Sequence, residues 1–298
     1  MELFYDKKPG YDKLDKKACM DYAEGYKAFL DEGKTERDAV DAIVRMAEAK
    51  GYKAYVRGMA VNPGDKFYQI NRHKGIILAH IGSAPLSDGV RLTAAHLDAP
   101  RIDIRTVPLY EQDGMAYFKT HYYGGIKKYH WLAIPLELRG VVCVCRDGKV
   151  ERVPVHVGNK PGDPKFVITD LLPHLASEQM VKKATEVIKA ENMNVLLGSF
   201  PSENSADGDK DRVKRAILEY LNAEYGMTEA DFLSAELSCV PAFNACDIGF
   251  DRSLIGAYGH DDRVCSYPAA TALLDADDWQ HLTGDTVVMT RRRSARTA

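Results

Sequence analysis

The sequence predicts an α/β fold in which one layered α/β domain is interrupted by an inserted β-rich domain. Helical periodicity followed by strand-like runs fills the first third of the 298 residues. Short alternating runs separated by Gly and Asp-Gly turns follow, and these are typical of antiparallel strands. An α/β pattern then returns near residue 239. We therefore expect an α/β domain built from residues 1–103 and 239–298, with the insertion at residues 104–238.

Two helices are predicted in the first fifty residues. The first covers residues 11–32 and ends before Gly33, with one apolar face made of Leu14, Ala18, Tyr22 and Tyr26. The second begins after Thr35, which opens the capping-box-like sequence Thr-Glu-Arg-Asp, and Gly51 ends it. Its buried stripe is expected to be Val40, Ile43, Val44 and Ala47.

The later elements follow from similar signals. Strand-like runs after residue 52 end in polar clusters, and ligands of layered α/β domains gather at the carboxyl ends of strands. Within the insertion, the sequence Cys-Arg-Asp-Gly-Lys-Val at residues 145–150 predicts a hairpin turn. Residues 177–192 and 209–226 are both predicted to be helical.

Composition excludes several classes of partner and location. The net charge of −3 gives no basis for a nucleic acid or an anionic membrane as partner. No apolar run approaches the roughly 18 residues needed to span a bilayer, and the N-terminus lacks the apolar core of a signal peptide. The six cysteines are scattered without a Cys-x-x-Cys pair, which predicts reduced thiols and a cytoplasmic protein.

His96-Leu97-Asp98, at the end of a predicted strand, is the first motif whose side chains could form a functional site. Residues two apart in a strand point the same way, so an imidazole and a carboxylate would lie side by side. This suits a metal ligand whose orientation is fixed by a carboxylate. Taken alone, such a pair is more often structural.

The second candidate motif is His260-Asp261-Asp262-Arg263, which follows Gly259. Adjacent carboxylates before a helix are most often a solvated helix start, because Asp favours the first turn. The functional alternative is that one Asp bridges two metal ions while the Arg balances the charge. Neither motif decides the function alone.

Together with their flanks, the two motifs resemble one family, the di-zinc aminopeptidases that include aspartyl aminopeptidase and yeast vacuolar aminopeptidase I. The matching segments are AAHLDAPRIDIR, HYYGGIKKYHWLAIPLELRGVV, FVITDLLPHLASEQ and ELSCVPAFNACDIGFDRSLIGAYGHDDRVCSY. The resemblance implies an α/β/α metallopeptidase domain interrupted by a β-rich dimerisation domain. It also implies peptide substrates, a dimer-based homo-oligomer, and two Zn²⁺ ions per site, replaceable by other divalent metals.

The resemblance also implies roles for single residues. His96 corresponds to a zinc ligand, Asp98 to the carboxylate that orients it, and Asp261 to the carboxylate that bridges both ions, with Asp262 as its polar neighbour. His174 corresponds to a histidine of the dimerisation domain that reaches the partner's active site; its alternative is a surface loop residue. For the remaining histidines of the β-rich part, we expect packed or hydrogen-bonded side chains; these are His121, His130 and His156.

One part of the family's active centre is missing from the sequence. The resemblance implies a Glu-Glu pair after a hydrophobic strand, where the first Glu is the general base and the second a zinc ligand. No Glu-Glu pair occurs in the 298 residues. The expected position is the basic stretch that follows the strand-like Thr-Val-Val-Met at residues 286–289.

A frameshift accounts for this stretch. Permitted codons for residues 289–298, read from the third base of the Met codon, give Asp-Lys-Glu-Glu-Ile-Gly-Ser-Asp-Gly, which is close to the family motif. The leading Asp is forced, and the later positions depend on codon choice. We therefore expect residues near 289–298 to be an out-of-frame tail on a truncated metallopeptidase domain. The alternative function is an inactive fragment that at most dimerises through the insertion; a related zinc peptidase or a peptide-binding module finds no support in the middle segments.

Overall fold

The computed structural model describes residues 10–276 and 282–289. Two compact units divide this part of the chain: unit 1 comprises the residues up to 98 and from 244 onward, and unit 2 comprises residues 99–243. The predicted junctions, 103/104 and 238/239, lie inside strands of unit 2, each five residues from the observed junction. The difference arises because β5 (Arg101–Gln112) and β11 (Glu236–Pro241) belong entirely to the sheet of the insertion.

Unit 1 begins with a short 3-10 turn, η1 (Gly10–Lys13), and the helix α1 (Lys16–Glu32). The helix therefore starts later than predicted, because the Asp15 side chain accepts a hydrogen bond from the Ala18 amide and caps it. The backbone amide of Gly33 bonds to the Phe29 carbonyl oxygen at the predicted end. The predicted apolar face was wrong in part, since Leu14 and Tyr22 are exposed and the buried residues are Tyr26, Phe29 and Leu30.

The second helix, α2 (Glu36–Ala49), has the predicted N-terminal cap. The Thr35 hydroxyl accepts a hydrogen bond from the Asp38 amide at 3.2 Å. Val40, Ile43 and Ala47 are fully buried, as the spacing predicted, and Val44 packs at the edge of the same core.

The sheet of unit 1 has five strands in the order β1-β2-β3-β14-β4. Their bounds are β1 Lys53–Ala54, β2 Lys66–Asn71, β3 Gly75–His80, β4 Val90–His96 and β14 Thr283–Met289, with the 3-10 turn η2 (Leu86–Asp88) before β4. β14 pairs antiparallel with β3 and parallel with β4, and its last residue, Met289, lies opposite His96. The strand-like end of the sequence is thus an interior strand beside the first chemical motif.

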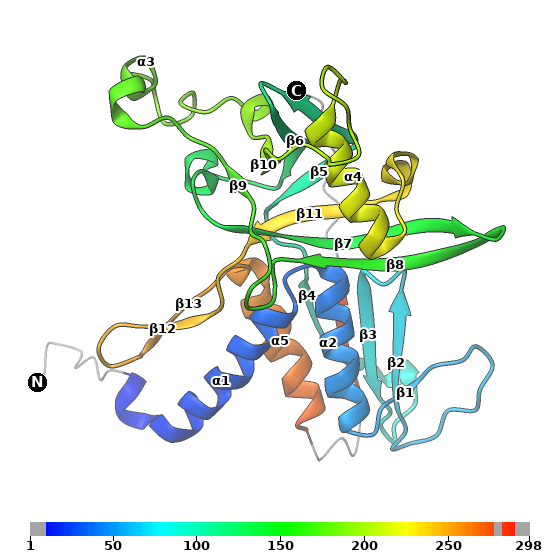
Figure 1. Ribbon diagram of the computed structural model, residues 1–298. Coiled ribbons are helices and arrows are strands. Elements are labelled where there is room, and N and C mark those ends of the chain that lie inside the picture. The colour runs from blue at the N-terminus through cyan, green and yellow to red at the C-terminus, as the bar shows by residue number, and fades with distance from the viewer. Residues whose placement is uncertain (1–9, 277–281, 290–298) are drawn as a thin grey trace, which may run out of the picture. The chain divides into compact units, whose positions relative to one another are not determined.

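Helices α1, α2 and α5 (His260–Leu274) enclose the core of unit 1 against one face of this sheet (Figure 1). Ile76 and Leu78 of β3 and Val288 of β14 point into this core, and each is at most 1% exposed. Ile77, between the first two, faces the other side and is exposed, as strand alternation requires. A two-stranded hairpin, β12 (Cys246–Ile248) and β13 (Leu254–Gly256), precedes α5.

Unit 2 is built on a seven-stranded sheet in the order β8-β7-β11-β5-β6-β10-β9. The strands besides β5 and β11 are β6 (Met115–Tyr123), β7 (Leu136–Arg146), β8 (Lys149–Val157), β9 (Val167–Ile168) and β10 (Val195–Gly198). The predicted hairpin joins β7 to β8, where Arg146 pairs with Lys149. Asp147 and Gly148, between them, both have positive φ, the backbone that an Asp-Gly turn supplies.

The helical elements of unit 2 are η3 (Lys128–Trp131), η4 (Pro173–Leu175), α3 (Ser177–Met180), η5 (Ala190–Asn192), α4 (Arg212–Tyr225) and η6 (Glu229–Ser234). α4 confirms the second predicted helix, and Gly226 ends it in the left-handed region. The predicted helix over 177–192 was wrong, because only one turn of α3 forms. Met180 and Val181 stay exposed, so no packed face stabilises a longer helix.

Two further expectations concern the tail at residues 289–298 and membrane-spanning segments. The tail expected at 289–298 lies outside the described residues, apart from Met289 at the end of β14. None of the helices in the described ranges combines the length and the apolar character that crossing a bilayer demands.

Candidate metal site

His96 is the last residue of β4, and its ring has a defined tautomer. Its Nδ1 lies 3.0 Å from the backbone carbonyl oxygen of Asp98, which can only accept a hydrogen bond. Nδ1 therefore carries a proton and donates it, and in the neutral ring Nε2 keeps its lone pair. The Asp98 carboxylate is nearly buried and lies 3.4 Å from the same Nδ1. This is the arrangement of a histidine prepared to bind a metal through Nε2.

Two carboxylates at the start of α5 face this nitrogen. His96 Nε2 lies 3.5 Å from Asp261 Oδ1 and 3.8 Å from Asp262 Oδ2. Asp261 is the more exposed, at 77% of its side chain against 22% for Asp262. Asp262 is held by further contacts, since it accepts hydrogen bonds from the His96 amide and from the Cys265 thiol, and the latter bond raises the pKa of that thiol. Asp261 is thus the carboxylate that is more available to a ligand.

The start of α5 is fixed by a close fit between Gly259 and Arg263. Gly259 has φ +90°, and a Cβ there would clash with Arg263 Nη1. Arg263 is buried and donates from Nη2 to the carbonyl oxygen of Lys34, while its guanidinium lies over the Tyr258 ring. Asp261 and Asp262 have non-helical dihedral angles, so the regular helix begins after them. The two carboxylates therefore sit at a helix start, where negative charge is favoured.

The donor set fits a divalent metal ion. One ligand atom each from His96, Asp261 and Asp262 lies within 4.8 Å of the other two. An unprotonated imidazole nitrogen with carboxylate oxygens is a combination that zinc binds in proteins. This is a cluster of two motifs that are about 165 residues apart in the sequence, brought together by the packing of α5 on β4, where Ser266 Oγ donates to the His96 carbonyl oxygen at 2.7 Å.

Sequence reasoning missed residues that support this cluster from other elements. Tyr26 of α1 bonds to the His260 ring, and Ser266 ties α5 to β4. The spacing of apolar residues in a helix predicts which side chains are buried. It does not predict which polar side chains form hydrogen bonds with other elements. His174 lies in η4 of unit 2, on the exposed surface of that unit.

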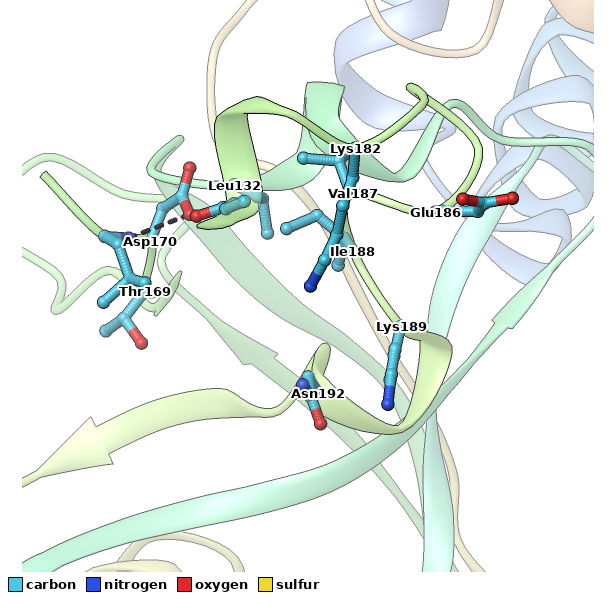
Figure 2. A pocket seen from close by; sticks show the side chains of 11 residues that line it. Leu132, Thr169, Asp170, Lys182, Glu186, Val187, Ile188, Lys189 and Asn192 are labelled. Atoms are coloured by element: carbon cyan, nitrogen blue, oxygen red, sulfur yellow. Dashed lines mark hydrogen bonds between the residues drawn. The ribbon is translucent and has the colours of Figure 1, made fainter. Parts of the chain in front are cut away.

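Unit 2 contains a cavity of about 290 Å³ (Figure 2). Leu171 and Gln179, which lie on either side of His174 in the sequence, are among its lining residues. Asp170 lines it and accepts hydrogen bonds from the Gln179 side chain and the Leu171 amide. Lys182 and Glu186 also line it, beside apolar side chains such as Ile188. Both signs of charge and apolar surface meet in this cavity, so its lining does not single out one class of ligand.

Comparison with known proteins decides the family. Residues 29–290 match the family described as aminopeptidase I zinc metalloprotease (M18). The chain belongs to this family. A probable M18 family aminopeptidase 1 from Clostridium acetobutylicum is 43% identical over 281 residues, which cover 92% of this chain and 59% of the relative. The chain thus spans less than two thirds of the length of such M18 relatives.

Solved M18 structures share the fold. The crystal structure of an M18 aminopeptidase from Thermotoga maritima matches 96% of this chain and 61% of its own, with a TM-score of 0.87 and 40% identity. The S. cerevisiae mApe1 dodecamer matches 91% of this chain and 60% of its own, with a TM-score of 0.69 and 18% identity. The mixed α/β architecture is therefore that of the M18 aminopeptidases.

Proposed function

We propose that this chain carries part of the active centre of a zinc-dependent aminopeptidase, which removes the N-terminal residue of peptides. The observation that supports this most directly is the cluster of His96, Asp261 and Asp262 in a chain of the M18 family. Bound zinc ions lower the pKa of a coordinated water and polarise the scissile carbonyl. We propose two ions per site, with Asp261 between them.

In this proposal each side chain of the cluster has a separate role. His96 offers Nε2 as a metal ligand, because Asp98 holds the proton on Nδ1 through its carbonyl oxygen. Asp261 offers the more exposed carboxylate, which suits a bridging role. Asp262 bonds to the His96 amide, so its part is to fix the turn against β4.

The pairing of β14 supports the assignment of the missing glutamates. β14 runs parallel to β4, and Met289 is the residue opposite His96. The resemblance expects a Glu-Glu pair directly after this strand. Ligands of layered α/β domains gather at the carboxyl ends of the strands, and His96 and Met289 both stand at such an end. The place expected for the base and for a further ligand is therefore next to the candidate metal site.

A chimaera tests the reaction. Residues after Met289 are replaced by the corresponding remainder of the Clostridium acetobutylicum relative, and release of the N-terminal residue from aminoacyl-anilides is followed with added zinc. We expect hydrolysis, and its loss in His96→Ala and Asp261→Ala. Full hydrolysis by the His96→Ala chimaera in saturating zinc contradicts the assignment.

The second candidate function is that of a catalytically inactive chain. The 298 residues contain no Glu-Glu pair, and it is from this pair that the resemblance takes the general base. We expect chain 1–298 to leave aminoacyl-anilides unhydrolysed with zinc or cobalt added. Zinc-dependent release of an N-terminal residue by purified chain 1–298, lost in His96→Ala, rules this candidate out.

We further propose that unit 2 joins copies of the chain into a dimer-based homo-oligomer. Apolar side chains are exposed along its segment 171–181; they are Leu171, Leu172, Leu175, Met180 and Val181. Patches of this kind mark protein contacts. In this proposal His174, within the segment, reaches the partner's active site. Light scattering of Leu175→Glu/Val181→Glu, compared with the unchanged chain, tests the contact: a dimer that persists in the variant contradicts it.

A cytoplasmic location completes the proposal. All six cysteines are free, and Cys239 alone among them is fully buried. Exposed unpaired thiols fit a reducing compartment.

A further inference from the structure

The residue immediately before the candidate bridging carboxylate is anchored at both ring nitrogens. His260 Nε2 lies 3.1 Å from the carbonyl oxygen of Ile255, and His260 Nδ1 lies 2.9 Å from the Tyr26 hydroxyl. A carbonyl oxygen only accepts, so Nε2 carries the proton. In the neutral ring Nδ1 is then an acceptor, and the Tyr26 hydroxyl donates to it. One tautomer satisfies both bonds, and it fixes the orientation of the ring.

Tyr26 is well suited to hold this bond. Its side chain is buried, and its ring packs against Tyr267, with centroids 5.4 Å apart, and against His260 at 5.8 Å. Burial raises the pKa of Tyr26 to about 12, so the hydroxyl keeps the proton that it donates. The donor is therefore rigid and comes from α1, an element far from α5 in the sequence.

The position of Asp261 depends on its backbone. Its side chain is 77% exposed, so packing does not fix it, and its dihedral angles depart from those of the helix that follows. The residues on its two sides are both held: Asp262 by the His96 amide and His260 by Tyr26 and Ile255. Of these anchors, the bond from Tyr26 is the one that α1 supplies.

We propose that Tyr26 and His260 are positioning residues for the candidate metal site, with Tyr26 acting through His260 to hold the backbone of Asp261 opposite His96. This rests on the proposed metal-binding function of His96 and Asp261. The recognised ligand is a divalent cation, and the contribution of the pair is to keep a carboxylate oxygen within reach of the ion that His96 Nε2 binds. Loss of the Tyr26 hydroxyl frees the turn without removing a ligand.

The test is the affinity of chain 1–298 for Zn²⁺, measured by titration with NMR detection of the histidine ring signals. We expect Tyr26→Phe to weaken binding about tenfold, the lower end of the range for residues that support metal ligands. His260→Gln retains a donor toward Ile255 but loses the Nδ1 acceptor. We expect it to weaken binding to the same extent, and Tyr26→Phe/His260→Gln to add nothing further, because both changes break one bond.

Two matched controls separate positioning from general stability. The Tyr22 hydroxyl also joins α1 to α5, at Thr271 Oγ1 (2.8 Å), and the buried Tyr52 hydroxyl bonds to the Leu273 carbonyl oxygen near the other end of α5. We expect Tyr22→Phe and Tyr52→Phe to change the zinc affinity less than twofold. Equal affinities in Tyr26→Phe and these controls overturn the positioning role while leaving the metal site intact.

The same titration detects failure of the metal site itself. If His96→Ala binds zinc as the unchanged chain does, or if neither the unchanged chain nor the chimaera binds it, the proposed metal site is wrong and the positioning role is wrong with it. A long-range ¹H–¹⁵N spectrum of the histidine rings adds a direct readout. Tyr26→Phe should shift the His260 Nδ1 signal, whereas Tyr22→Phe should not, and an unchanged Nδ1 signal in Tyr26→Phe contradicts the hydrogen bond.

Discussion

The Nδ1 of His96 lies closer to the backbone carbonyl oxygen of Asp98, at 3.0 Å, than to the carboxylate of the same residue, at 3.4 Å. The backbone therefore fixes the tautomer, and the carboxylate adds charge beside the ring. Substitution of Asp98 removes the second effect only.

Asp98→Asn separates these two effects. We expect the zinc affinity of chain 1–298 to fall about tenfold, since the carbonyl oxygen remains and only the negative charge beside the ring is lost. His96→Ala, which removes the ligand atom itself, should abolish binding in the same titration. A loss in Asp98→Asn as complete as that in His96→Ala would show that the carboxylate, and not the backbone, holds the ring.

Gly259→Ala tests the fit at the start of α5. The alanine would have to adopt φ +90°, and its Cβ would clash with Arg263 Nη1. We therefore expect a loss of about 2–3 kcal/mol in the free energy of unfolding, together with weaker zinc binding. Gly51→Ala is the matched control, because Gly51 has φ +82° and no atom near the added methyl group. Equal urea midpoints for the two variants would mean that the contact with Arg263 has no energetic consequence.

Glu111 of β5 caps α4 from another element. Its Oε2 accepts hydrogen bonds from the amides of Val213 and Lys214, at 2.7 and 3.0 Å, whereas the N-cap residue Asp211 makes no side-chain cap bond. We expect Glu111→Ala to destabilise unit 2 by about 1–2 kcal/mol, as loss of a helix cap does. Denaturant unfolding followed by circular dichroism measures this. The exposed neighbour Gln112→Ala should have no comparable effect, and a Glu111→Ala midpoint equal to that of Gln112→Ala refutes the cap.

His80 predicts part of the pH dependence of stability. Burial on β3, with Lys66 nearby, lowers the pKa of His80 below its ordinary value of 6.5. As the pH falls through 6.5, the unfolded chain takes up this proton before the folded chain does, so the free energy of unfolding decreases. The contribution of neutral His80 to the free energy of unfolding is complete above pH 6.5, and it is lost as the pH falls toward the lower pKa of His80 in the folded chain.

His80→Gln removes this linkage. We expect its stability to change less between pH 7 and pH 5 than that of the unchanged chain, as measured by urea midpoints at both values. His121→Gln, at an exposed position of β6, should keep the pH dependence of the unchanged chain. The same slope in His80→Gln as in His121→Gln would exclude His80 as its source.

Local signals in the sequence were sufficient where one short segment determines its own structure. The Thr35 cap and the Asp-Gly turn of residues 147–148 follow from side-chain and backbone preferences of a few residues. The helix predicted over residues 177–192 was wrong, because its composition favours a helix while its apolar side chains find no partner surface. The start of α1 was placed too early for a related reason, since Asp15 provides a cap that the apolar spacing did not reveal.

The candidate site was predicted as two separate motifs, whose residue types can be read directly from the sequence: an imidazole with a carboxylate two residues on, and paired carboxylates before a helix. The tertiary structure decided that the two motifs meet, because α5 packs on β4 and brings Asp261 within 3.5 Å of His96. It also decided that β14 lies between β3 and β4, opposite His96, and that Tyr26 reaches His260. Such contacts join segments that are far apart along the chain, and they form only when buried apolar surfaces bring whole elements together, so no local pattern encodes them.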